Sequence, residues 1–188
     1  EQLRIFLGEC FHSFRPSPRR PFALLELGTY CGYSSVFFAN ELQKLDLDFK
    51  IYTVEVDKTN EDVAKKIIRM SKMEDHIQVL HLDLAKDQTI SHLLATLEEL
   101  HKVDFLFIDH DKEKYLTDLQ LLESSGLIQK GTFVAADNIV FAQIDDYRTY
   151  IQTLQSNHIV SSKLEPSMLE YTEYVKATDD YSDGIEMS

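Results

Sequence analysis

Acidic side chains stand at or just beyond the end of each of five short apolar runs. They are Glu26, Glu55, Asp83, Asp109 and Asp137. A hydrophobic core does not need carboxylates at these positions. Carboxylates that converge can bind a cation, an amine or a pair of hydroxyl groups. These five residues are therefore the first candidates for a binding or catalytic site.

The first run continues into a turn with two glycines, LELGTYCGYSS, in which Gly28 and Gly32 allow a ligand to approach the backbone closely. Tyr30 stands where a dinucleotide-binding turn has its second glycine, and Glu26 would repel a pyrophosphate but suit a cationic, amino-acid-like ligand. Glu55 is at a suitable distance along the chain to accept both hydroxyls of a ribose. The alternative is a packing turn with Glu55 as a surface cap. The pattern favours a positively charged nucleoside, S-adenosylmethionine.

A second group of polar residues follows two later runs, in FIDHDKEKY and AADNI. Asp109 ends one run, and Asp137 and Asn138 end the next, so their oxygens are expected to converge. Two carboxylates and an amide without a cysteine form a ligand set for a hard cation, and they suit a Mg²⁺ ion that keeps water or substrate oxygens. A single Asp after a strand is more often a helix N-cap, but the adjacent Asp-Asn pair favours the metal interpretation.

Lys112 and His110 lie beside Asp109. Close to a dication an ammonium group gives up its proton more easily, so Lys112 is a candidate general base, although its spacing also fits a solvent-facing lysine beside Glu113. His110 could stack on or hydrogen-bond to an adenine, and the alternative is an uncommitted loop histidine. No histidine has an i, i+4 partner of a liganding type, so a zinc site is not expected. Cys31 has no neighbouring histidine to activate it as a nucleophile.

The apolar runs that must position these residues are rich in β-branched, aromatic and leucine side chains, which is typical of strands buried on both faces. They cover residues 23–27, 50–56, 76–82, 103–109 and 131–137. Between them, apolar residues recur at helical spacing over 34–45, 60–70, 93–100 and 115–127. This alternation predicts a Rossmann-like α/β fold with a mostly parallel sheet and helices on both faces. Ligands bind such sheets beyond the carboxyl ends of the strands.

The two ends of the chain depart from this alternation. An opening helix is expected before the proline-rich link RPSPRRP. After Tyr150 the stretches SNHIVSSKLE, MLEYTEYVKA and DGIEMS have strand composition and leave no room for helices, which predicts a C-terminal antiparallel hairpin. We expect residues 1–188 to form a single domain, because the chain has the length of one.

The chain carries 19 basic and 32 acidic side chains, for a formal net charge of −13. This sign argues against nucleic acid and anionic membrane surfaces as partners, and no apolar run is long enough to span a bilayer. Two cysteines, Cys10 and Cys31, allow at most one disulfide, so we expect a reducing, cytoplasmic compartment. We expect a monomer or weak dimer.

These motifs resemble the catechol O-methyltransferase family, which is a family of cation-dependent class I S-adenosylmethionine methyltransferases. The resemblance rests on LELGTYCGYSSV, TVEVD, FIDHDKEKYLTD, LLESSGLIQKGT, ADNIV and MLEY, which occur in the family's order with compatible spacing between Leu24 and Glu186. It implies an enzyme that uses Mg²⁺ to move a methyl group from S-adenosylmethionine to a hydroxyl of a small catechol-type substrate.

The resemblance also implies a role for each matching residue. The cofactor would be bound by Glu26, Gly28, Tyr30, Ser34, Glu55, Asp83, Asp109 and His110, with Asp83 the weakest match. The Mg²⁺ ligands would be Asp109, Asp137 and Asn138, and the catalytic base would be Lys112. The acceptor would contact Asp109, Lys112, Asn138 and Glu170, the last of which matches the acid that hydrogen-bonds to the second catechol hydroxyl.

Three departures from the family leave other functions open. Asp111 stands where the family has a tryptophan near the adenine, Ala142 stands where it has a proline beside the catechol ring, and its N-terminal helices are expected to be largely missing before Glu1. The alternatives are a cation-dependent O-methyltransferase for larger phenolic esters such as acyl-CoA esters, and a cofactor-binding homologue without catechol activity. A nicotinamide dehydrogenase fits the fold alone, but Glu26 and Tyr30 argue against it.

Overall fold

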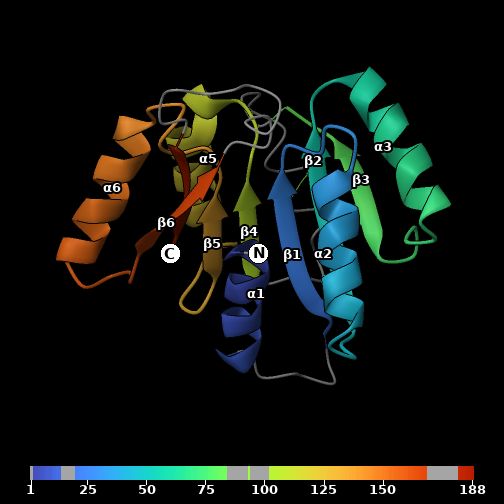
Figure 1. Ribbon diagram of the computed structural model, residues 1–188, viewed down its shortest axis with the longest axis horizontal. Coiled ribbons are helices and arrows are strands. Elements are labelled where there is room, and N and C mark those ends of the chain that lie inside the picture. Colours follow the sequence, from blue (N-terminus) through green and yellow to red (C-terminus); the bar gives the residue numbers. More distant parts are fainter. Residues whose placement is uncertain (1, 14–19, 84–92, 94–101, 169–181) are drawn as a thin grey trace.

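The computed structural model describes residues 2–13, 20–83, 93, 102–168 and 182–188 (Figure 1). The helices of the described residues are α1 (Gln2–Ser13), α2 (Tyr33–Gln43), α3 (Lys58–Met70), the short 3₁₀ helix η1 (Lys112–Lys114), α5 (Tyr115–Ser124) and α6 (Asp145–Ser156). The strands are β1 (Phe22–Leu27), β2 (Phe49–Glu55), β3 (Ile77–His81), β4 (Phe105–Ile108), β5 (Phe133–Ala136), β6 (Lys163–Met168) and β7 (Ser182–Met187).

The strands form one sheet in the order β3-β2-β1-β4-β5-β7-β6, in which β1 to β5 are mutually parallel. Each predicted strand is present, and the boundaries differ from the predicted ones by no more than two residues. The order places β4 beside β5, so the residues that follow these two strands become neighbours. The predicted α/β fold with a parallel sheet is confirmed.

Two hydrophobic clusters cover the two faces of the sheet, because the side chains of each strand alternate between them. Along β1, Phe22 and Leu24 pack with residues of α1, α2 and α3, whereas Ala23, Leu25 and Leu27 pack with residues of α5 and α6. In Figure 1, α1 and α2 lie in front of the sheet. Burial on both faces explains why these strands are continuous apolar runs in the sequence.

The two strands at the C-terminal end are antiparallel. β7 pairs with β5 on one side and with β6 on the other. The connection between β6 and β7 falls in 169–181, outside the described residues, as does almost all of MLEYTEYVKA. The expected C-terminal hairpin therefore stays a prediction, although its two ends pair with each other.

The predicted helices differ from the observed ones at their C-terminal ends. α2 ends at Gln43, and Leu45, which the spacing assigned to its apolar face, is 46% exposed. α5 ends at Ser124, so the buried Leu127 belongs to the loop that follows and not to the helix. The predicted segment 93–100 lies outside the described residues apart from the buried Leu93.

The helix α6 was not predicted, and the change of pattern that we placed after Tyr150 is wrong. Tyr147 and Ile151 are buried one helical turn apart on α6, and Asp145 and Asp146 lie in its first turn. Acidic residues at a helix start and apolar residues at i and i+4 were the signals that could have found it. None of the helices in the described residues is long and apolar enough to span a bilayer.

Candidate active site

The carboxyl ends of four parallel strands lie at one level. Four residues paired across the sheet mark this level, namely Val54, Leu27, Ile108 and Ala136. The next residues along these strands therefore form a row, namely Glu55, Gly28, Asp109 and Asp137. The pairing extends into the row, because the N–H of Asp109 donates to the Leu27 carbonyl at 2.9 Å and that of Asp137 to the Ile108 carbonyl at 3.0 Å. The fold thus brings together four predicted site residues.

Gly28 lets the turn after β1 approach the end of β4. Its φ is +101°, and a Cβ atom at this position would lie 2.7 Å from the carbonyl carbon of Asp109 and 2.9 Å from the backbone nitrogen of His110. Gly32, with φ of +82°, caps α2. Tyr30, between the two glycines, also has positive φ and is 70% exposed. Close packing therefore requires a glycine at position 28, as the alternative of a packing turn expects, and the approach of a ligand to this turn stays a prediction.

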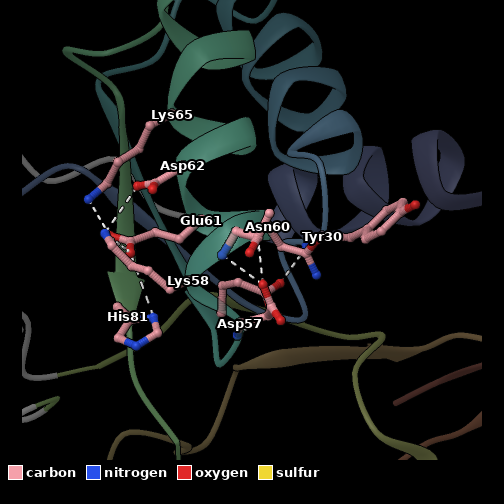
Figure 2. A network of polar contacts seen from close by, with 10 residues as sticks. Tyr30, Asp57, Lys58, Asn60, Glu61, Asp62, Lys65 and His81 are labelled. Carbon is pink, nitrogen blue, oxygen red and sulfur yellow. Dashed lines mark hydrogen bonds and ion pairs between the residues drawn. The ribbon is translucent and has the colours of Figure 1, made fainter.

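The carboxylate of Glu55 is oriented by two backbone groups. It accepts hydrogen bonds from the Tyr30 N–H at 2.7 Å and from the Asp57 N–H at 2.9 Å, one on each oxygen. Asp57 in turn caps α3 by accepting from the N–H groups of Asn60 and Thr59, and these bonds, that from Asn60 first, lower the pKa of Asp57 (Figure 2). The carboxylate thus lies between the turn after β1 and the start of α3.

Glu61 ties α3 to the end of β3. This almost fully buried carboxylate accepts hydrogen bonds from Lys58 and Lys65, and the Nδ1 atom of His81 lies 3.6 Å from it (Figure 2). The bond from Lys58 is the largest cause of the lowered pKa of Glu61. The resulting stabilisation is present at neutral pH and is lost as the pH falls through the folded-state pKa, below 4.5. His81 is the last residue of β3, so the network joins the first turn of α3 to the carboxyl end of this strand.

A cavity of about 510 Å³ opens at the row of strand ends. Six of the predicted cofactor residues line it, namely Gly28, Tyr30, Glu55, Asp83, Asp109 and His110. The wall is completed by the apolar residues Leu27, Val54, Val56 and Leu82 and by Asp111, Lys114 and Asp118. The volume is in the range of small-molecule and cofactor sites.

Glu26 and Ser34 lie behind the turn and do not line this cavity. On β1, Glu26 lies on the face of the sheet that α2 covers. It is 0% exposed and accepts a hydrogen bond from Ser35 through Oε2. Burial raises its pKa, against the opposing effect of the neighbouring hydroxyls of Ser34, Ser35 and Thr53. Its Oε1 is buried without a hydrogen-bond partner in the described part of the chain. The carboxylate expected beside the ligand is thus enclosed between β1 and α2.

Lys112 links the ends of β4 and β5 through a tyrosine that we had assigned only to the apolar face of a helix. Its Nζ donates to Asp109 Oδ1 at 2.6 Å and to the Tyr115 hydroxyl at 2.7 Å. The same hydroxyl donates to the backbone carbonyl of Asp137 at 3.1 Å. Asn138 follows with φ of +58°, and its N–H donates to Asp137 Oδ1 at 2.8 Å. The structure therefore brings together the predicted base and the residues predicted to bind metal.

His110 is held by two neighbours on α5. Its Nε2 lies 2.9 Å from Asp118 Oδ2, and its ring stacks on that of Tyr115 with centroids 5.2 Å apart and planes 8° apart. Its Nδ1 is buried without a hydrogen-bond partner among the described residues. If Asp118 is ionised, it can only accept, so Nε2 carries a proton and Nδ1 of a neutral ring presents a lone pair. Asp118 was not predicted, because only the fold places it opposite His110.

The two residues at which the chain departs from the catechol O-methyltransferase pattern have local roles. Asp111 is exposed at the cavity wall, and its side chain caps η1 by accepting from the Glu113 N–H at 3.2 Å. Ala142 is partly buried against the cluster that contains α5 and α6, and its N–H donates to the Asn138 carbonyl at 3.1 Å. An acid and a small apolar side chain thus replace the larger groups expected there.

The structure does not test the predicted role of Glu170 or the predicted metal site. Glu170 lies outside the described residues. No three Asp, Glu, His or Cys side chains of the described residues gather as a metal-binding group. The predicted set of Asp109, Asp137 and Asn138 contains only two carboxylates, so that finding does not bear on it.

Residues 22–165, from the start of β1 into β6, match the family model described as O-methyltransferase. The chain belongs to the O-methyltransferase family. It is 31% identical over 171 residues to catechol O-methyltransferase of Sus scrofa, with 89% of this chain and 82% of that protein covered. The identity to the Bos taurus enzyme is also 31%, but the chain spans 55% of that protein's length. It is 33% identical to the transmembrane O-methyltransferase of Homo sapiens over 72% of this chain and 45% of that protein.

Solved structures show the same fold at lower identity. An O-methyltransferase from Bacillus cereus, in complex with SAH, superimposes with a TM-score of 0.68 at 19% identity and covers 99% of this chain and 79% of its own. The O-methyltransferase TomG from Streptomyces achromogenes, in complex with SAM, superimposes with a TM-score of 0.69 at 17% sequence identity. The match covers 99% of this chain and 78% of the TomG chain. The predicted family and enzyme class, an S-adenosylmethionine-dependent O-methyltransferase similar to catechol O-methyltransferase, are confirmed.

Proposed function

We propose that this chain transfers a methyl group from S-adenosylmethionine to a hydroxyl of a small catechol-type acceptor, with Mg²⁺ as cofactor. The observation that carries the proposal is the row of Gly28, Glu55, Asp109 and Asp137 at the strand ends, beside a cavity of about 510 Å³. Family membership supports the methyl transfer itself, and the catechol acceptor and Mg²⁺ rest on the residues.

The cavity fits the nucleoside of the proposed cofactor. Each oxygen of Glu55 accepts one backbone N–H, which leaves lone pairs for two ribose hydroxyls. His110 also lines the cavity, where its ring is the candidate contact for the adenine. The charged groups that line the cavity are mostly acids, namely Glu55, Asp83, Asp109, Asp111 and Asp118, against Lys114. An acidic lining favours a sulfonium cofactor over the pyrophosphate of a dinucleotide.

The residues at the ends of β4 and β5 fit a hard cation. Asp109 and Asp137 supply carboxylates and Asn138 an amide, which is an oxygen donor set of the kind that Mg²⁺ prefers. When bound, Mg²⁺ would orient the acceptor oxygens and stabilise negative charge on them. Asp109 also accepts from Lys112, so the proposed base lies directly beside the proposed metal site.

The roles of the chain's own groups follow from these positions. Lys112, as the free amine, accepts the proton of the reacting hydroxyl. The hydrogen bond from the second hydroxyl is assigned to Glu170 by the resemblance alone, because Glu170 lies outside the described residues. The acceptor oxygen forms a bond to the methyl carbon as the carbon–sulfur bond breaks and leaves its electron pair on sulfur. The products are a methyl ether, S-adenosylhomocysteine and protonated Lys112. Most of the acceleration comes from orientation of the two reactants.

Calorimetric titration of the cofactor tests the binding site. Wild type is expected to bind S-adenosylmethionine and not NAD. Glu55→Gln should weaken the affinity about tenfold or more, because a hydrogen bond to a charged group contributes about 1.5–3 kcal/mol. Glu123→Gln is the matched control, since Glu123 accepts from Tyr150 on α6 and does not line the cavity. Equal affinity of the Glu55→Gln variant and wild type would contradict the ribose role.

A second candidate function is cofactor binding without catechol methylation. It is favoured by Asp111, which lines the cavity where the family has tryptophan. S-adenosylmethionine binding without methyl transfer to any of a panel of catechols would support it. A CoA ester acceptor would need basic groups at the mouth, which the acidic lining of the described residues does not favour.

Both cysteines are free, and we propose a reducing, cytoplasmic compartment on that basis.

A further inference from the structure

The hydroxyl of Tyr115 is the junction between the two strand ends that carry the proposed chemistry. Tyr115 is 0% exposed, yet its hydroxyl accepts from Lys112 Nζ at 2.7 Å and donates to the Asp137 carbonyl at 3.1 Å. One bond reaches the proposed base, and the other reaches the backbone of a proposed metal ligand. A phenylalanine would fill the same apolar space, so packing alone does not account for the hydroxyl.

The ring of Tyr115 is fixed from two sides. It stacks on His110, whose Nε2 lies 2.9 Å from Asp118, and it meets the edge of Tyr147 of α6 with centroids 6.0 Å apart and planes at 79°. A ring clamped between two aromatic neighbours has one position for its hydroxyl. The hydroxyl is therefore a rigid acceptor, whereas the four-carbon stem of Lys112 is flexible.

The second contact of Lys112 would change when the site is loaded. Its Nζ also donates to Asp109 Oδ1 at 2.6 Å, and Asp109 is one of the carboxylates proposed for Mg²⁺. A cation at Asp109 would draw on the same oxygen atoms. The Tyr115 hydroxyl belongs to no proposed metal ligand, so it can keep its bond to Lys112 in both situations.

We infer that Tyr115 is a positioning residue, whose hydroxyl holds the amine of Lys112 at the end of β4 and links it to the backbone of Asp137, the residue that follows β5. The kinetic part of this inference rests on the proposed function, in which Lys112 takes the proton of the acceptor. The positional part does not, because it concerns only where Lys112 is held in the ligand-free protein.

The kinetic test compares Tyr115→Phe with Tyr150→Phe. Both variants lose one tyrosine hydroxyl that is hydrogen-bonded inside the protein, but Tyr150 donates to Glu123 in the last turn of α5, away from the cavity. Tyr115→Phe should lower kcat about tenfold or more, with KM for the acceptor and the affinity for S-adenosylmethionine within about twofold of wild type. The Tyr150→Phe variant should keep kcat. An unchanged kcat in Tyr115→Phe, or a loss explained by weaker binding, would overturn the inference.

The positional test needs no activity. Competitive acetylation of the ligand-free protein, followed by mass spectrometry, gives the labelling rate of Lys112 relative to the exposed Lys130 of the same chain. Tyr115→Phe should raise this ratio severalfold, and Tyr150→Phe should leave it unchanged. An equal ratio in all three proteins would overturn the inference even if wild type methylates catechols. A raised ratio in a protein that methylates nothing would contradict the proposed function alone.

Discussion

At the scale of single residues, the site combines carboxylates in opposite environments. Glu55 faces the cavity with both oxygens hydrogen-bonded to backbone N–H groups, whereas Glu26 is fully buried with one oxygen unpartnered among the described residues. Burial raises the pKa of Glu26, so its ionised form is the costly one. A group with a raised folded-state pKa stabilises the fold below its unfolded pKa, and this contribution is lost as the pH rises through the folded-state pKa.

The Glu26→Gln variant tests that cost. The amide is neutral at every pH, so the variant should be more stable than wild type at neutral pH. The difference in melting temperature should shrink as the pH is lowered towards 4.5, the ordinary pKa of a glutamate. Thermal denaturation of both proteins from pH 8 to pH 4.5 measures it. A difference in stability that is the same at every pH would contradict the raised pKa of Glu26.

At the scale of elements, the turn between β1 and α2 packs closely against the end of β4. Gly28 combines a positive φ with a backbone contact to Asp109 and His110 that leaves no space for a Cβ atom. Gly126, at the end of α5, also has a positive φ of +79°, but a Cβ atom there would meet nothing within 4 Å. The two positions therefore separate the cost of the backbone conformation from the cost of the close approach.

Replacing each glycine by alanine measures these two costs. Gly126→Ala should lower the free energy of unfolding by about 1–2 kcal/mol, the cost of a left-handed residue with a side chain. Gly28→Ala should lower it by more than about 4 kcal/mol, since the backbone of β4 must also move. Urea denaturation gives both values. Equal losses would mean that the end of β4 yields without cost.

Strands and the residues at their ends could be predicted because the local order of apolar and polar residues indicates their environment. A strand buried on both faces is a continuous apolar run, and the polar residue that follows it marks the carboxyl end. The burial of Glu26 could have been expected, because on β1 it lies on the same face as Leu24 and the strand is apolar on both faces. The partners of the Tyr115 hydroxyl could not be predicted. The position of Tyr115 in the helical pattern is that of any core residue, and its bond to Asp137 joins residues 22 apart in the chain.

At the scale of the whole molecule, the negative charge extends into the cavity. The chain carries a formal net charge of −13, and among the described residues five acids and one lysine line the cavity. Such a lining attracts a cationic ligand and a metal ion and repels phosphates. The sheet then sets the geometry, because four strands that end at one level bring the proposed cofactor residues and the proposed metal ligands to adjoining positions.

The measurement that tests this account most directly is transfer of labelled methyl from S-adenosylmethionine to a catechol, with Mg²⁺ and with EDTA, by wild type and Asp137→Ala. Wild type should turn over with Mg²⁺ and fall to background in EDTA, and Asp137→Ala should stay at background in both, because orientation of the acceptor oxygens is lost. Tyr150→Phe is the control for an ordinary loss of stability. Undiminished, EDTA-insensitive methyl transfer by Asp137→Ala would contradict the account.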